Sequence, residues 1–346
     1  MSRRALTLLL AAVIGVSMTL IAAVAAVPYV ALAPGPTYNT LGTDHGTPVI
    51  TVAGRQTFPD TGHLNMTTIS VVTRLTLAQA LRGWFQHDLA VVPRDVIYPP
   101  NRTEKQVQAE DQAAMRASQN SATTAALREI GVPGTVHVLV AQVEPGAPAT
   151  GRLRAGDELV SVDGSRVVDA RQLRTLIGER RPGDRVQISY VRAGKPEEQT
   201  LTTASTAAKD GSVRPVIGVQ TRERTEFPVR VTISLSDVGG PSAGLMFALG
   251  IVDKLEPGSL TGGRFIAGTG TIDDDGTVGP IGGITQKLIG ARHKGATVFL
   301  VPADNCAEAL KGPPAGLRLI KVSTLKSALA DLGKLARGEA TTPCGR

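Results

Sequence analysis

An uncharged apolar run at the N-terminus constrains this chain more than any other sequence feature. After Arg3 and Arg4, no charged residue occurs before Asp44, and residues 5–33 are long and apolar enough to cross a bilayer. The paired arginines favour a cytoplasmic amino end, so the positive-inside rule places everything after the run outside the cytoplasm. We therefore predict a single-pass protein of the cell membrane whose folded part lies on the extracytoplasmic side.

A cleaved signal peptide is the competing interpretation of the same run. Ala23-Val24-Ala25 offers the small residues of a cleavage site. The run is longer than the apolar core of a typical signal peptide, which favours an uncleaved anchor. We assign residues 1–33 to a cytoplasmic stub and transmembrane anchor.

Charge and composition exclude several classes of partner. The 37 basic and 30 acidic side chains are scattered without a basic block, and aromatic residues make up only 3% of the chain, so we expect no nucleic-acid surface. The sequence contains neither an H-E-x-x-H motif nor a cysteine cluster, and it has no G-x-x-x-x-G-K-[ST] motif for phosphate. We therefore expect no metal, no cofactor and no ATP-driven unfolding.

Two cysteines, Cys306 and Cys344, lie in the part of the chain that we expect to be exported. An even number of cysteines in an oxidising compartment favours a disulfide, which would tie the tail to the last domain. The alternative is a pair of unpaired thiols, one on a helix and one on the tail.

Residues 132–204 have the pattern of a compact β-rich unit. A strand is expected at 135–143, a helix from Asp169 to Glu179 with Asp169 as its cap, and a further strand at 185–192. The turns between them carry the sequences E-P-G-A-P-A, L-R-A-G-D and V-D-G. This arrangement resembles a PDZ domain of the bacterial, protease-associated type.

The resemblance to PDZ domains implies a way of binding peptides. An extended peptide would add as a strand beside residues 136–140 and under the helix that follows, with side-chain pockets for selectivity. Free C-termini and internal segments both stay open as ligands, because the turn at 131–134 lacks the usual apolar residue between its glycines. A purely structural PDZ unit is the alternative. The peptide-binding residues would be Val136, Val138, Val140 and Leu173.

A glycine-rich turn presents Ser242 between a predicted strand and a predicted helix. Residues 231–235 alternate as a strand does, G-G-P-S-A-G follows at 239–244, and apolar residues recur at helical spacing over 245–252. Glycines let a substrate backbone approach, and the first amides of a helix favour an oxyanion beside the serine. Ser242 is therefore a candidate nucleophile. The alternative is that Ser242 is an ordinary N-cap and that Pro241 only marks the start of the helix.

A serine nucleophile needs a base, and Lys287 is the best candidate in the sequence. It follows the turn Gly282-Gly283, and apolar residues succeed it along a predicted helix. Burial among apolar groups lowers the pKa of a lysine and leaves the amine neutral, as a general base must be.

A histidine triad is the alternative to the lysine. G-x-S-x-G also occurs in α/β-hydrolases, where Asp274 and His293 would complete an acid–histidine pair. Little chain follows the serine, and His293 stands between Arg292 and Lys294 in a polar helix end. Both observations favour the lysine as the base.

Three motifs carry a second family resemblance. P-S-A-G occurs at 241–244, G-T-G-T-I at 268–272, and G-P-I-G-G-I-T-Q-K-L-I-G-A-R-H-K-G-A-T-V-F-L-V-P at 279–302. Together they resemble the proteolytic domain of Lon proteases. The order of anchor, PDZ and Lon-type domain resembles the membrane-anchored, PDZ-containing Lon-like proteases of Gram-positive bacteria, including actinobacteria.

The Lon resemblance implies roles for individual residues. Ser242 would be the nucleophile, Lys287 the general base and Thr269 the residue that orients the lysine, with Gly240 and Pro241 supporting the turn. It also implies assembly into a homo-oligomeric ring. Many Lon enzymes carry an acidic residue three positions before the serine, whereas this chain has Gly239 there. Its nearest acidic residue, Asp237, lies two positions further away.

We expect an α+β multidomain protein. Because Lon-type domains begin with strands well before the serine, and 63–72 has that character, we expect the PDZ unit to be inserted within the protease domain. The expected segments are the anchor at 1–33, strands and a long helix that pack on the protease domain at 34–131, the PDZ domain at 132–204, the Lon-type domain at 216–338 and a tail at 339–346.

The function that these residues predict is that of an ATP-independent serine endopeptidase. It would degrade or process exported or membrane-associated polypeptides selected through the PDZ domain. Two alternatives stay open. One is a non-catalytic PDZ scaffold or peptide-binding protein with an inactive Lon-like domain, and the other is an esterase. The client and the cleavage preference do not follow from the sequence.

Overall fold

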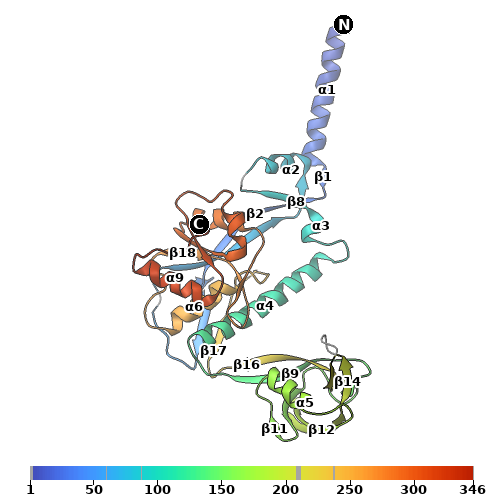
Figure 1. Cartoon of the computed structure of the whole chain (residues 1–346). Coiled ribbons are helices and arrows are strands. Elements are labelled where there is room, and N and C mark those ends of the chain that lie inside the picture. The colour runs from blue at the N-terminus through green and yellow to red at the C-terminus, as the bar shows by residue number, and fades with distance from the viewer. Residues whose placement is uncertain (1–2, 60, 87, 208–211, 237, 346) are drawn as a thin grey trace. The chain divides into compact units, whose positions relative to one another are not determined.

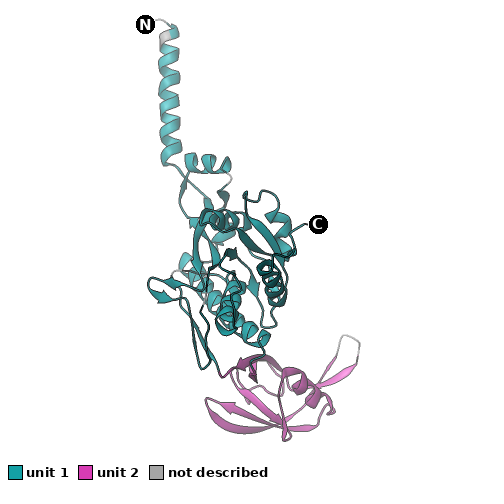
Figure 2. Cartoon of the chain, turned by 90° about the vertical axis from the view of Figure 1, so that its left-hand side faces the viewer, with its two compact units in different colours: residues 1–132, 229–346 teal, residues 133–228 magenta. Residues whose placement is uncertain are grey.

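The computed structural model describes residues 3–59, 61–86, 88–207, 212–236 and 238–345. The chain forms two compact units (Figure 2). Unit 1 comprises residues 1–132 and 229–346, and unit 2 comprises residues 133–228. Unit 2 is therefore inserted between two stretches of unit 1. Both units mix helices and strands, which confirms the expected α+β class.

The N-terminal helix α1 (Arg3–Val24) is the one helix, among the residues described, that is long and apolar enough to cross a membrane. It ends nine residues earlier than predicted. The proline pair at 34 and 36 does not break this helix but lies within strand β2 (Tyr29–Asn39). The pairing of β2 with its neighbour shifts between Pro34 and Thr37, and such an irregularity lets an internal strand tolerate proline.

A six-stranded sheet forms the centre of unit 1 (Figure 1). Strand β6 (His63–Val72) has the predicted bounds and pairs in parallel with β18 and antiparallel with β2, which joins early and late parts of the chain. A second early strand, β5 (Ile50–Ala53), pairs with β17 (Arg230–Ile233) just after the insertion. In order, the central sheet runs β22 (Arg318–Val322), β21 (Val298–Pro302), β18 (Phe265–Gly268), β6, β2 and β8 (Ala90–Pro93).

Helix α6 (Gly244–Leu255) is buried on almost every side, because strand β6 and the helices α4 (Glu104–Glu129) and α9 (Leu325–Ala336) all pack against it. That position explains why its sequence is apolar all round. Helix α4 begins with a capping box between Thr103 and Gln106. One face of α4 is buried, although its sequence is polar overall.

Short elements complete unit 1. Helix α7 (Ile284–His293) packs on strands β2 and β6. The others are β1 (Ala26–Val27), β3 (Thr43–Asp44), β4 (Thr47–Pro48), β7 (Leu75–Thr76), α2 (Leu77–Trp84), α3 (Arg94–Ile97), β19 (Thr271–Ile272), β20 (Val278–Gly279), the 3-10 turn η1 (Ala303–Asn305) and α8 (Cys306–Ala309).

Unit 2 is a twisted antiparallel sheet covered by helix α5 (Ala170–Gly178), which Asp169 caps as predicted. Residues 219–226, expected in the last domain, instead form β16 and pair with β9 inside unit 2. The sheet runs β13 (Lys195–Thr202), β12 (Arg185–Arg192), β10 (Glu158–Val162), β9 (Thr135–Val143) and β16 (Val219–Glu226), with β11 (Ser165–Arg166) beside β10. Strands β14 (Ala204–Ala207) and β15 (Val213–Val216) pair antiparallel in a separate two-stranded sheet.

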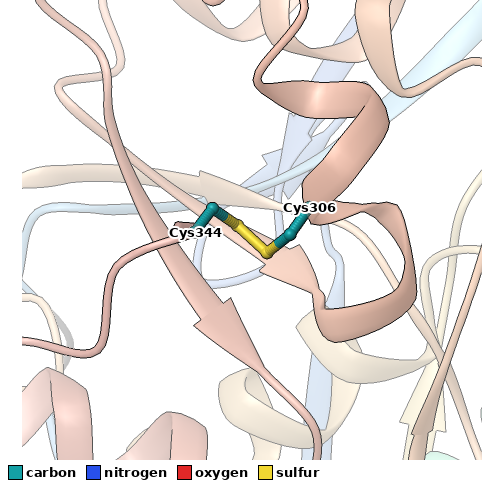
Figure 3. Close-up of a disulfide and its surroundings, with 2 residues drawn as sticks. All are labelled: Cys306 and Cys344. Atoms are coloured by element: carbon teal, nitrogen blue, oxygen red, sulfur yellow. A yellow bond between two sulfur atoms is a disulfide. The ribbon is translucent and has the colours of Figure 1, made fainter. Parts of the chain in front are cut away.

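A disulfide joins Cys306, the first residue of α8, to Cys344 in the tail (Figure 3). The pairing predicted from the cysteine count is therefore present. Backbone contacts hold the same tail against the edge of the central sheet, where Lys321 N–H donates to the Thr342 carbonyl at 2.9 Å. Cys344 of the tail is thus buried in the core of unit 1.

Removing this disulfide should lower the stability of unit 1. The cross-link closes a loop with a sequence separation of 38 residues. For a loop of this length, loop-closure entropy predicts that the disulfide adds about 4 kcal/mol to the free energy of unfolding. We expect Cys344→Ser to reduce the calorimetric Tm by roughly 8–16 °C at about 2–4 °C per kcal/mol. A reducing agent should have the same effect on the natural chain and none on a variant lacking both cysteines. An unchanged Tm in Cys344→Ser would contradict the prediction.

Candidate active site

Ser242 lies in the loop between β17 and α6, two residues before the helix begins. Gly240 has a positive φ of 81°, which a residue with a side chain would adopt only with strain. The N-cap of α6 is Ala243, and no side chain caps the helix. The interpretation of Ser242 as an ordinary N-cap is therefore wrong, and its hydroxyl serves another contact.

That contact is with the amine of Lys287. Lys287 Nζ lies 2.7 Å from Ser242 Oγ and 2.9 Å from Thr269 Oγ1. Thr269 Oγ1 in turn donates to the Ser242 carbonyl at 2.9 Å. Loop, strand end and helix thus bring three side chains from distant parts of the sequence into one hydrogen-bonded group.

Burial sets the electrostatics of this group. The Lys287 side chain extends from the first turn of α7 into the core, where only 2% of the residue is exposed. Desolvation of the ammonium lowers the pKa of Lys287 to about 7. At neutral pH a large fraction of the amine is therefore uncharged and able to accept a proton from the serine hydroxyl.

The geometry does not support the histidine alternative. His293 is exposed at the end of α7, and Asp274 is exposed in a loop, where its backbone carbonyl accepts from Arg128. The structure therefore places a lysine, and not a histidine, beside Ser242.

Helix α4 holds the loop that carries Ser242, which the sequence analysis did not foresee. Ser118 Oγ donates to the Pro241 carbonyl at 2.9 Å, and Gly240 N–H donates to the Asp111 carbonyl at 2.9 Å. The sequence signal for this contact was Ser118, a small polar residue among the alanines of α4. A helix face made of small residues lets another segment's backbone approach closely.

The same close approach accounts for Gly239, where the chain departs from many Lon enzymes. A Cβ at Gly239 would come within 2.9 Å of the Asp111 Cβ, so a side chain there would push α4 away. The acidic group beside the serine loop comes instead from α4, because Asp111 lines the cavity next to Ser242. Burial and the neighbouring Glu110 raise the pKa of Asp111. Asp237 lies outside the described residues.

A cavity of about 590 Å³ opens onto Ser242 and Lys287. Its walls come from β6, α3, α4 and the serine loop, and most of the side chains that line it are apolar. Among these lining residues are Met66, Ile69, Val107 and Met115. The cavity is large enough for one or two side chains of a peptide beside the reactive pair.

The strand predicted to pair with a peptide on unit 2 is not an edge strand, so this prediction is wrong. Strand β9 lies between β10 and β16, so no further strand can add beside residues 136–140. Val138 and Val140 are fully buried in the core together with Leu173, and Val136 faces the β16 partner Thr225 across the ladder. The sequence could not show that 219–226 returns to cover β9, because that pairing joins segments about eighty residues apart.

Comparisons with known proteins agree with this architecture. Residues 106–203 match the family model of the PDZ domain, and residues 212–332 match that of the Lon protease (S16) C-terminal proteolytic domain. Lon protease 1 of Sorangium cellulosum is 38% identical over 112 residues, which are 31% of this chain and 13% of that protein. Lon protease 2 of Herpetosiphon aurantiacus is 29% identical over 150 residues, 43% of this chain and 16% of that protein.

Among solved structures, the PDZ domain of an SdrC-like protein from Listeria innocua is similar. It is 30% identical, and the alignment covers 25% of this chain and 93% of that one with a TM-score of 0.23. The chain thus combines a PDZ domain with a Lon-type C-terminal proteolytic domain, as the sequence motifs predicted. Its homologues are Lon proteases, and it spans less than a fifth of the length of the two relatives described.

Replacing Lys287 should reveal the cost of burying its amine. Because burial lowers the folded-state pKa, the unfolded chain binds more protons than the folded one between about pH 7 and 10.5, so stability rises with pH across that window. We expect Lys287→Met to raise the Tm at neutral pH, by roughly 2–4 °C for each kcal/mol of unfolding free energy that the natural chain loses by burying the amine. The difference in Tm between the variant and the natural chain should shrink towards pH 10.5.

Calorimetry across this pH range provides the measurement. Lys294→Met removes an exposed lysine from the end of the same helix and serves as the matched control, with little expected change. A Lys287→Met variant that loses the same stability at neutral and alkaline pH would argue against a desolvated amine.

Proposed function

We propose that this chain is a serine endopeptidase that cleaves exported or membrane-associated polypeptides without ATP. The single observation that carries the proposal is the 2.7 Å contact between Ser242 Oγ and the buried amine of Lys287. A serine paired with a neutral lysine is a known variant of the serine–histidine arrangement. The match of residues 212–332 to a Lon proteolytic domain supports the choice of peptide bonds as the substrate.

In the proposed mechanism, Lys287 Nζ takes the proton of the Ser242 hydroxyl as Oγ attacks the peptide carbonyl. The resulting ammonium then gives that proton to the leaving amine, and the same lysine activates water to hydrolyse the acyl-enzyme. Thr269 holds the amine in line with the serine through the 2.9 Å contact to Nζ. A pKa of about 7 suits both halves of this cycle, since the group must accept and release a proton near neutrality.

Backbone amides around Ser242 would stabilise the oxyanion, because they precede the first turn of α6 and its positive dipole end. The Gly240 N–H is already bonded to the Asp111 carbonyl, so Gly240 and Pro241 support the turn rather than the oxyanion in this structure. The absence of a phosphate-binding motif from the sequence supports action without ATP. Substrates would then be flexible segments that enter the cavity unassisted.

We further propose that unit 2 presents substrates along β16. Among the described residues, β16 is the last strand of its sheet, and its outer edge has no strand partner. Helix α5 lies beside this edge, where the Ala170 N–H donates to Glu223 Oε1 at 2.8 Å. A peptide added to β16 would run along α5 and contact Leu176, a partly buried residue of that helix.

We infer the location from α1. Its apolar stretch from Leu6 to Val24 has a mean hydropathy of 2.4 and would anchor the chain in the cell membrane. Arg3 and Arg4 precede it and favour a cytoplasmic N-terminus, so both units would lie outside the cytoplasm.

Substitutions at the reactive group test the protease. Ser242→Ala and Lys287→Ala should each lower kcat/KM on an unstructured protein such as casein by about 10³-fold or more. Thr269→Val, which leaves the amine less well held, should lower kcat by about 10–100-fold. The activity of the natural chain should fall tenfold per pH unit below about pH 7 as Lys287 becomes protonated, and added ATP should change nothing.

His293→Ala is the matched control and should cleave as the natural chain does. No cleavage by the natural chain would favour the non-catalytic PDZ scaffold. Activity on esters that survives Lys287→Ala and is lost in His293→Ala would favour the esterase.

A charge beside the proposed peptide edge tests unit 2. Leu176→Arg should raise KM for protein substrates by about tenfold, because the arginine would fill the space between α5 and β16 while the reactive group is untouched. The kcat on a short peptide should stay the same. Thr175→Arg adds the same charge at an exposed neighbouring position and should leave both constants unchanged. Equal KM values for the two variants would refute peptide binding at this edge.

A further inference from the structure

Helix α2 and the residue after it expose a continuous apolar stripe. Its members, here called the α2 face, are Leu77, Leu81, Trp84 and Phe85, which are 36, 44, 54 and 86% exposed. They recur at helical spacing on one side, while Ala80 and Gly83 face the protein. A Cβ at Gly83 would come within 2.7 Å of Val91, so α2 lies tightly on β8 with its apolar side turned outward.

The α2 face lies where the chain leaves helix α1. The Leu77 N–H donates to the carbonyl of Ala25, the residue that follows α1, at 3.0 Å. Strand β1 then pairs with β7, with Ala26 opposite Thr76. Figure 1 shows α2 beside this end of α1. If α1 spans a bilayer, α2 begins at the level where the hydrocarbon ends.

The chemistry of the face fits that level. Tryptophan and other aromatic rings prefer the interface between hydrocarbon and headgroups. Trp84 is held in place by an edge contact with Tyr29, whose ring centroid lies 5.9 Å away. Two exposed arginines, Arg74 and Arg82, flank the face and can meet anionic headgroups, with Asp88 as the nearby opposing charge.

We propose that the α2 face lies in the outer interface of the membrane and gives the catalytic unit a second lipid contact beside α1. The proposal rests on the anchoring role given to α1 above. The contacts of α1 and of the α2 face with the bilayer would together fix the tilt of unit 1. A single transmembrane helix joined to unit 1 by a flexible linker would leave that tilt undefined. Strand β2 starts at this level and reaches the cavity at Tyr38, so the site would lie within about 30 Å of the membrane, at roughly 3.3 Å per residue.

Trp84 is itself the probe, because the chain contains one tryptophan. The full chain is reconstituted in vesicles of phosphatidylcholine and phosphatidylglycerol, and lipids brominated near the headgroup are compared with lipids brominated near the chain end. We expect a blue-shifted Trp84 emission, stronger quenching by the shallow bromine, and protection from aqueous iodide relative to the denatured chain.

A double variant, Leu81→Ser with Phe85→Ser, should restore iodide access and lose at least half of the quenching by bromolipid. Leu310→Ser removes a comparably exposed leucine (46%) elsewhere in unit 1 and should change neither signal. Trp84 that is open to iodide and unquenched by lipid, in a chain that floats with vesicles and resists carbonate extraction, would overturn the membrane contact while the anchor stands.

The remaining outcomes are equally decisive. Protection from iodide without quenching by bromolipid would show that a second protein copy covers the face and would refute the proposal. A chain that fails to float with vesicles would refute the anchor and the α2 contact together. Casein cleavage, measured separately in detergent, reports on Ser242 and Lys287 whatever the result with lipid.

Discussion

The burial of one amine is the constraint on which the rest of unit 1 depends. Lys287 is removed from water by α7 packing on β2 and β6, and the desolvation that brings its pKa to about 7 also costs stability. The surrounding sheet must therefore be stable enough to exclude water from the amine. Its strands come from both sides of the insertion, which is why residues 29–93 are as necessary to the site as the segment that carries Ser242.

Helix α4, which is distant in sequence, restricts which residue can occupy position 239 in the serine loop. Ser118 and the backbone of Asp111 hold the loop, and their closeness leaves no room for a side chain at Gly239. An acidic residue at that position would displace α4. The glycine at 239 therefore fits this packing, and Asp111 of α4 is among the residues that line the cavity.

Much of the secondary structure could be predicted because it is encoded locally. The strand at 63–72, the cap at Asp169 and the helix after Gly283 all follow from alternation, capping chemistry and glycine placement. The errors concern long-range pairing. Residues 29–33 were expected at the end of the membrane anchor because they are uncharged, and the pairing with β6 and β8 makes them part of strand β2. Residues 219–226 likewise joined the sheet of unit 2 and covered the expected peptide edge.

The sequence by itself determined the chemical candidates, because glycine turns and apolar neighbours single out Ser242 and Lys287, and the resemblance to Lon proteases adds Thr269. It also determined the apolar span and favoured the pairing of the two cysteines. The tertiary structure decided that the lysine reaches the serine at 2.7 Å, that α4 holds the serine loop, and that β16 is, among the described residues, the last strand on one side of the sheet of unit 2. These features depend on contacts between segments dozens to hundreds of residues apart, which no local pattern of side chains specifies.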